Sequence, residues 1–183
     1  MKPRTTRLLI GFVVLIAVVG VASLGRARPR RTESPCTSPS IFIEKSERYL
    51  ELRCEGLPPR RFPATFGANP VGPKRQEGDE RTPEGRYHIT SRVRPPRFHR
   101  FLGVSYPNAE DRAASRALGI RRPGRGIGIH GVREALAPLA HVFIRTARSV
   151  AWGPTDGCIG LTNEDVEVVY EAVRAGTDVD ISP

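Results

Sequence analysis

Short runs of strand-forming residues recur along this chain after residue 40, and glycine or proline separates them. The chain has 18 Gly and 17 Pro among 183 residues, and these two residues are the strongest turn signals in a sequence. The runs cover residues 41–45, 49–53, 61–66, 87–93, 98–104, 127–129 and 177–181. Short strands at this spacing predict a mostly β fold, a sandwich or barrel, with a few short helices.

Two segments, 109–118 and 163–175, have the pattern of helices. Asn108 can cap the first and Gly119 can end it. The second has a capping-box pair, one apolar face and a glycine stop, formed by Thr162, Asp165, Val166, Val169, Tyr170, Val173 and Gly176. Because it starts soon after Cys158, its packing is expected to fix the loop that carries this cysteine.

The first 24 residues predict an export signal or a membrane anchor. Three basic residues precede an uncharged run, residues 8–24. This run is longer than the usual apolar core of a cleaved signal peptide and at the low limit for a spanning helix. No convincing small-X-small cleavage site follows it, which favours an uncleaved anchor. Residues 25–40, rich in Arg, Pro, Ser and Thr, predict a linker, and residues 41–183 predict the folded domain.

A cysteine next to glycine, Cys158, and a histidine 28 positions before it, His130, suggest thiol chemistry. A free thiol has a pKa of about 8.5 and is only slightly ionised at neutral pH, so a nucleophilic cysteine needs a base. His130 ends a short apolar run and is the best candidate. His99, flanked by two arginines, is the second candidate. The plain alternative is a buried cysteine and an unrelated structural histidine.

His130-Gly131, followed later by a small polar residue, any residue, Gly157, Cys158 and Ile159, resembles the catalytic signature of the L,D-transpeptidases of bacterial cell walls, the YkuD-type domain. Further motifs occur in the order found in that family: Asn69–Lys74, Glu77–Asp79, Arg81–Tyr87, Ser105–Asn108 and Thr162–Val166. The resemblance covers about residues 41 to 182.

The resemblance implies a β-sandwich or barrel-like catalytic domain that acts on peptidoglycan stem peptides without a cofactor. Cys158 would be the nucleophile and His130 the base, with Gly157, Gly131 and Tyr106 at substrate and oxyanion positions. A thioester acyl-enzyme would pass to a second stem peptide or to a wall-attached protein, and passage to water would make the protein an L,D-carboxypeptidase. The domain would lie in the periplasm, anchored in the inner membrane or secreted. The family is generally sensitive to carbapenems.

Two alternatives remain beside this interpretation. One is a catalytically silent cell-wall-binding module, although a binder has no need of both Cys158 and His130. The other is a general cysteine peptidase, which the order His before Cys and the Gly-Cys-Ile context disfavour because they do not resemble papain-like enzymes.

Three departures from the family pattern concern substrate contacts. Many members carry His where this chain has Asp156, and Arg where it has Gly160. The substrate contacts that those His and Arg side chains make in the family therefore cannot be assigned to this chain. The interval between His130 and Cys158 is also longer than in compact members, so residues 132–153 are expected to form an insertion or lid beside the site.

The other two cysteines, Cys36 and Cys54, flank the first two predicted strands. A turn near residues 46–47 would bring them roughly opposite each other. A disulfide is geometrically plausible in an oxidising periplasm and would leave Cys158 as the free thiol. Two unrelated reduced cysteines are the alternative.

The net charge of +10 raises the question of nucleic-acid binding. Seven of the 29 Lys and Arg residues lie in the first 40 positions, and the rest follow no helix-turn-helix, zinc-ligand or aromatic-basic pattern. We therefore expect a solvated basic surface suited to an anionic envelope and no nucleic-acid partner. The three cysteines and four histidines lack metal-ligand spacing, so no metal site is expected.

Overall fold

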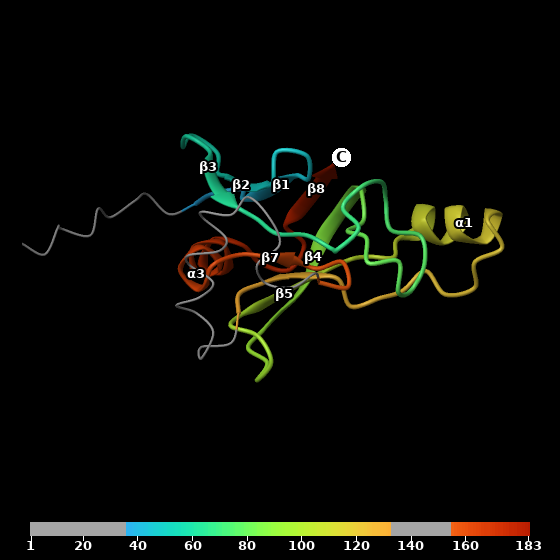
Figure 1. Cartoon of the computed structure of the whole chain (residues 1–183). Coiled ribbons are helices and arrows are strands. Elements are labelled where there is room, and N and C mark those ends of the chain that lie inside the picture. Colours follow the sequence, from blue (N-terminus) through green and yellow to red (C-terminus); the bar gives the residue numbers. More distant parts are fainter. Residues whose placement is uncertain (1–35, 133–154) are drawn as a thin grey trace, which may run out of the picture. The chain divides into compact units, whose positions relative to one another are not determined.

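The computed structural model describes residues 36–132 and 155–183 (Figure 1), which contain eight strands in one mixed sheet and two helices. The sheet order is β3-β2-β1-β8-β4-β5-β6-β7. The strands are β1 (Ser40–Glu44), β2 (Tyr49–Arg53), β3 (Arg60–Pro63), β4 (Gly85–Val93), β5 (Phe101–Val104), β6 (Gly128–His130), β7 (Ile159–Gly160) and β8 (Asp178–Ser182). The predicted mostly β fold with a few short helices is confirmed.

The central strands are half-buried ribbons whose side chains alternate between core and solvent. Ile41 and Ile43 of β1 are buried, and so are Val179 and Ile181 of β8, which pairs with β1 in parallel. Successive side chains of a strand point to opposite faces, so one face of this part of the sheet is apolar and covers the core. The remaining neighbours pair antiparallel, except β6 and β7, which are also parallel.

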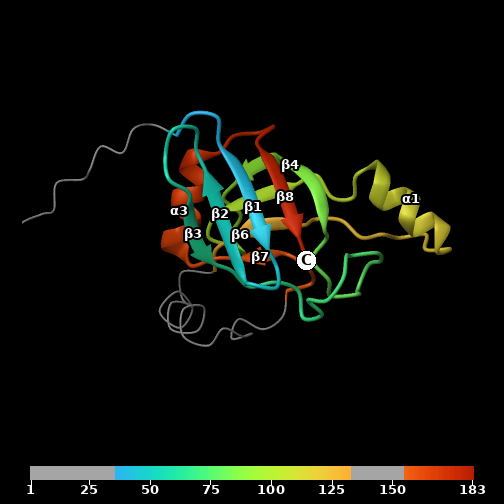
Figure 2. The ribbon, with the colours of Figure 1, turned by 90° about the horizontal axis from the view of Figure 1, so that it is seen from above.

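The sheet curls until its two ends meet. Thr65, just after β3, forms an isolated bridge with Gly160 of β7, and each backbone N–H donates to the other residue's carbonyl at 2.9 Å. A second bridge joins Gly67 to Thr155. In Figures 1 and 2, β3, β2, β1 and β8 run side by side in one layer, and β5 to β7 lie in another. This closure gives the barrel-like character that was expected.

The two helices, α1 (Ala109–Ala117) and α3 (Asn163–Ala172), begin at caps that the sequence predicts. Asn108 and Asp111 form a reciprocal capping box, with both hydrogen bonds at 2.9 Å. Thr162 Oγ1 accepts from the Asp165 N–H at 3.1 Å. α3 packs its buried face against the sheet, whereas α1 lies away from α3, on the far side of the domain (Figure 2).

The predicted end of the second helix is wrong by three residues. α3 ends at Ala172, not at residue 175, because Val173 is the C-cap and has an extended backbone. The Arg174 N–H then donates to Thr177 Oγ1 at 3.1 Å instead of continuing the helical ladder. Gly176, with φ of 87°, belongs to the turn that leads into β8.

Cys36 and Cys54 are joined by a disulfide, with their Cα atoms 5.2 Å apart. The bond ties the chain ahead of β1 to the end of β2, and Cys158 remains as the free cysteine. Of the predicted linker, only residues 36–40 are described. The predicted anchor or signal at residues 1–24 lies outside the described residues, as does the predicted insertion at 132–153 apart from Val132. In residues 36–132 and 155–183 no helix has the length and apolar character needed to cross a membrane.

Candidate active site

His130 ends β6, and Cys158 stands directly before β7, the strand that pairs with β6 in parallel. His130 pairs with Gly160 of β7, and Cys158 stands two residues before Gly160. Ile159, the residue after Cys158, pairs with Ile129, the residue before His130. Strand pairing therefore brings the two sequence-predicted residues into the same region of the sheet.

The thiol of Cys158 is held in its protonated form. Its Sγ donates to the Gly126 carbonyl over 3.6 Å. Burial raises the pKa of this thiol, and the Asp156 carboxylate adds to the rise. A backbone hydrogen bond from Gly128 and the charges of Lys74 and Arg97 act in the opposite direction on this pKa, but they do not overcome the burial.

His130 is buried with a defined tautomer. Its Nδ1 lies 2.8 Å from the Gly131 carbonyl, which can only accept, so Nδ1 carries the hydrogen and Nε2 is left as the acceptor. The ring stacks among aromatic side chains, 4.0 Å from the Phe98 centroid and 6.1 Å from that of Phe101. Burial lowers the pKa of His130, and the charge of Arg97 lowers it further, while the Gly131 bond opposes both.

At neutral pH both groups are therefore expected to rest in their neutral forms, as a thiol and an imidazole. A neutral imidazole with a free Nε2 can accept a proton from a thiol as the sulfur attacks a carbonyl. Such a pair is suited to covalent acyl transfer, in which the base acts only when substrate is present.

The loop that carries Cys158 is built around Gly157. This glycine has φ of 123°, and a Cβ at this position would lie 2.3 Å from the Arg81 carbonyl oxygen. Its N–H donates to Thr155 Oγ1 at 3.2 Å, and that hydroxyl in turn donates to the Cys158 carbonyl at 2.7 Å. In this structure the Gly157 N–H thus donates to Thr155. For Gly157 to hold the oxyanion, as predicted, this hydrogen bond would have to break and the N–H would have to donate to the oxyanion instead.

Gly131 supports the base through its backbone. Its carbonyl accepts from His130, and its N–H donates to the His99 carbonyl at 2.8 Å. A Cβ at Gly131 would lie 2.6 Å from Asn163 Oδ1, an atom that also accepts from the Val132 N–H at 2.8 Å. The first residue of α3 therefore packs directly on the turn after the base.

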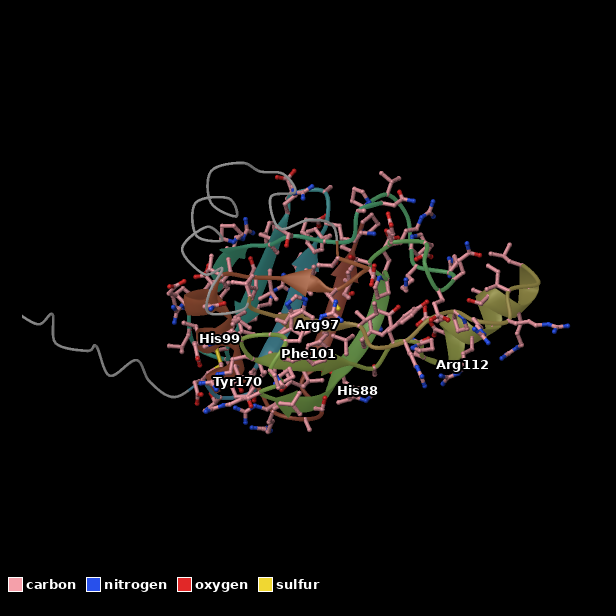
Figure 3. All side chains as sticks on the ribbon, turned by 60° about the horizontal axis from the view of Figure 1, so that its bottom comes forward. His88, Arg97, His99, Phe101, Arg112 and Tyr170 are labelled. Atoms are coloured by element: carbon pink, nitrogen blue, oxygen red, sulfur yellow. A yellow bond between two sulfur atoms is a disulfide. The ribbon has the colours of Figure 1, made fainter. Side chains whose placement is uncertain are left out.

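Tyr106 and His99, the other two sequence candidates, have partners of their own. The Tyr106 hydroxyl donates to the Pro123 carbonyl at 2.7 Å, and its side chain is buried edge-on to Tyr87. His99 Nε2 lies 2.7 Å from a Glu167 carboxylate oxygen of α3, on the side of the domain where Figure 3 shows Tyr170. These contacts favour structural roles for Tyr106 and His99.

Sequence reasoning missed the aromatic pocket of Phe98 and Phe101 around the base, and it missed Lys74. Phe101 is the cross-strand partner of His130, so a correct strand register would have revealed it. Lys74 sits in a recognised motif, but nothing local indicated a buried ammonium. Among the residues that the structure describes, no group of three or more His, Cys, Asp and Glu side chains is arranged to hold a metal ion.

The fold and these residues define a class of curled β domain, with a free cysteine just before β7 and a buried histidine at the end of β6, its parallel neighbour. The sequence profile of YkuD, the L,D-transpeptidase catalytic domain, matches residues 38–181. The chain belongs to this family.

Individual relatives are distant and longer. The Escherichia coli (strain K12) protein YafK is 25% identical over 105 residues, covering 56% of this chain and 32% of YafK. The solved structure of the helical cell shape determining protein Pgp2 from Campylobacter jejuni matches with 22% identity and a TM-score of 0.55, over 79% of this chain and 47% of that one. An L,D-transpeptidase from Mycobacterium smegmatis matches with 14% identity and a TM-score of 0.50, over 80% and 59%. This chain spans about a third of YafK and about half of Pgp2, and the two structural matches establish the fold alone.

Proposed function

We propose that this protein is a cysteine-dependent L,D-transpeptidase that acts on peptidoglycan stem peptides. The observation that supports this most directly is that the parallel pairing of β6 and β7 brings the loop of Cys158 next to the strand that His130 ends, with Nδ1 of the histidine engaged by the Gly131 carbonyl. That hydrogen bond leaves Nε2 free as the acceptor, which is what a base for a neighbouring thiol requires.

In the first half-reaction Sγ of Cys158 attacks the carbonyl of the third, diamino-acid residue of a donor stem peptide. His130 Nε2 takes the thiol proton as the carbon–sulfur bond forms. The tetrahedral intermediate collapses with loss of the terminal D-amino acid, whose leaving nitrogen receives the proton from His130. The product is a thioester acyl-enzyme.

Backbone N–H groups near Cys158 are the candidates to hold the oxyanion. Removing one such donor typically costs about 2.7–4 kcal/mol of transition-state stabilisation. Because the Gly157 N–H donates to Thr155 Oγ1, we propose the N–H of Cys158 itself as the principal donor. Its position follows from the tight turn at Gly157.

The second half-reaction decides the biological outcome. An amine from a second stem peptide would make a cross-link, an amine of a wall-attached protein would attach that protein, and water would give an L,D-carboxypeptidase. The Pgp2 likeness suggests a further link to cell shape, since that protein is described as determining helical cell shape. A catalytically silent wall-binding module would keep the fold but have no use for the free thiol of Cys158.

We further propose that the domain works in the cell envelope. Residues 1–24 would serve as an inner-membrane anchor or export signal, with the catalytic domain in the periplasm or secreted. An oxidising compartment is also where a disulfide such as Cys36–Cys54 forms and persists.

The direct test is to incubate the full-length protein with purified tetrapeptide muropeptides and identify the products by mass. Cross-linked dimers would indicate transpeptidation, and tripeptides alone would indicate carboxypeptidation. Cys158→Ala is the matched control. Unchanged substrate with wild-type protein, under conditions where the protein is folded, would contradict the proposal and favour the binding module.

A further inference from the structure

A buried lysine outside the Cys158–His130 pair reaches the loop that carries the nucleophile. Lys74 is only 3% exposed. Its Nζ lies 2.7 Å from Asp79 Oδ1 and donates to the Asp156 carbonyl at 3.2 Å. Asp156 stands two residues before Cys158, so the ammonium group holds the backbone next to the nucleophile. A buried ammonium carries a large desolvation cost unless it is paired and hydrogen-bonded, and both partners are present here.

The carboxylate that holds Lys74 is itself fixed by backbone groups. Asp79 Oδ2 accepts from the N–H groups of Arg75 at 2.7 Å and Gln76 at 3.0 Å, and Oδ1 accepts from Arg81 at 3.1 Å. These bonds fold residues 74–81 into a compact loop with a single orientation for the carboxylate. The stem of Lys74 is also confined, since a Cβ on Gly124 would lie 3.0 Å from its Cε.

The same loop touches the nucleophile loop at a second point. The Arg81 carbonyl occupies the space next to Gly157, where a Cβ would come within 2.3 Å of it. Residues 156 and 157 are therefore each in contact with the 74–81 loop, and Cys158 follows immediately. Two contacts on consecutive residues restrict both the position and the rotation of the peptide that leads into Cys158.

We propose that Lys74, held by Asp79, is a positioning residue for Cys158: it fixes the Asp156 carbonyl, two residues before the nucleophile. The proposal rests on the proposed function only in taking Cys158 as the nucleophile.

Three charged groups act on the pKa of the Cys158 thiol, and they differ in how strongly solvent screens them. The Asp156 carboxylate raises this pKa, and the charges of Lys74 and Arg97 lower it. Arg97 and Asp156 are exposed, whereas Lys74 is buried. Buried charges are screened much less than exposed ones. Of the two cations that lower this pKa, Lys74 is therefore the less screened.

Lys45, directly after β1, provides a matched control. It is also 3% exposed, and its Nζ lies 2.6 Å from Glu84 Oε1. Its other hydrogen bonds go to the carbonyls of Gly72 at 2.9 Å and Thr82 at 3.2 Å. The chemistry matches that of Lys74, but the partners lie in residues 72–84 and not in the nucleophile loop.

The experiment measures the rate of Cys158 alkylation by iodoacetamide as a function of pH, in the full-length oxidised protein. Cys158→Ala provides the blank. In Lys74→Met the rate profile should move to higher pH, and the rate at pH 7 should fall by roughly three- to tenfold, because the reactive thiolate becomes scarcer. Lys45→Met should lower the melting temperature but keep the rate within about twofold of wild type. Asp156→Asn should move the profile to lower pH.

Folding is followed by thermal unfolding of each variant. Should Lys74→Met fail to fold, Lys74→Gln keeps an N–H donor for Asp79 and the Asp156 carbonyl, and the same shift is expected. A folded Lys74→Met or Lys74→Gln with the wild-type profile overturns the proposal, and so does an equal shift in Lys45→Met. Alkylation needs no stem peptide, so this result is independent of whether the wild-type protein turns over muropeptides.

Discussion

Replacing Gly157 by alanine should destabilise the domain and displace Cys158. The backbone at this position has φ of 123°, which costs a residue with a side chain about 1–3 kcal/mol. The new Cβ would also lie 2.3 Å from the Arg81 carbonyl oxygen, and backbone atoms yield less readily than a flexible side chain. Overpacking of this kind costs about 1–3 kcal/mol more. The sum, about 2–6 kcal/mol, is a large fraction of the stability of an ordinary domain.

Thermal unfolding and the alkylation rate of Cys158 test this expectation together. The melting temperature should fall by roughly 5–20 °C, and the alkylation rate should change because relief of the clash moves the residue before the nucleophile. Gly56→Ala is the control, since Gly56 also has a positive φ, 73°, but a Cβ added there would meet no atom within 4 Å. It should lose only about 1–2 kcal/mol and leave the thiol unaffected. Equal losses in the two variants would refute the contact with Arg81 as the cause.

Three further outcomes are expected. Cys158→Ala should abolish muropeptide turnover and carbapenem adducts in intact-mass spectra while the melting temperature is kept, and activity within tenfold of wild type would disprove the thiol mechanism. His130→Gln should slow acylation by about 10²–10⁴-fold. In the wild-type protein the acylation rate should rise with pH to a plateau, with a midpoint below 6.5, because the pKa of His130 is lowered from that value. A midpoint above pH 7 would contradict a neutral resting imidazole. Thiol counting on denatured, unreduced protein should find one free cysteine. Reduction of the Cys36–Cys54 disulfide should lower the free energy of unfolding by about 3 kcal/mol in the chain-entropy model. Three free thiols in exported protein would exclude the disulfide.

The helices and strands that could be predicted are those that depend on local sequence patterns. The capping residues Asn108 and Thr162 mark the starts of α1 and α3 at the observed positions. Alternating apolar residues mark β1, β2 and β8 to within a residue or two. These signals depend on neighbours in the chain, so periodicity and turn chemistry suffice to read them. The end of α3 was missed because Thr177, beyond the helix, competes for the Arg174 N–H.

Within the candidate site, the sequence could point to the two groups proposed to react but not to their surroundings. Cys158 and His130 stand in a recognisable motif, but their surroundings come from distant parts of the chain. Lys74 meets the Asp156 carbonyl across 82 positions, and Phe98 meets the His130 ring by way of a hairpin. The motif of Tyr106 predicted a place at the substrate, and in the structure its hydroxyl donates to the Pro123 carbonyl. Such contacts follow from tertiary packing, which no short pattern encodes.

Gly160 connects the closure of the sheet with the chemistry of the site. It pairs with His130 on one side and with Thr65 on the other, and it lies two residues after Cys158. A Cβ at this position would lie 2.5 Å from Thr65 Oγ1. The side chain that many family members carry here therefore does not fit unless Thr65 moves, and the Thr65–Gly160 bridge is one of the two that close the sheet. Because β7 pairs with β6 and also closes the sheet, a substitution that loosens this bridge should disturb both the stability of the sheet and the β6–β7 register next to His130.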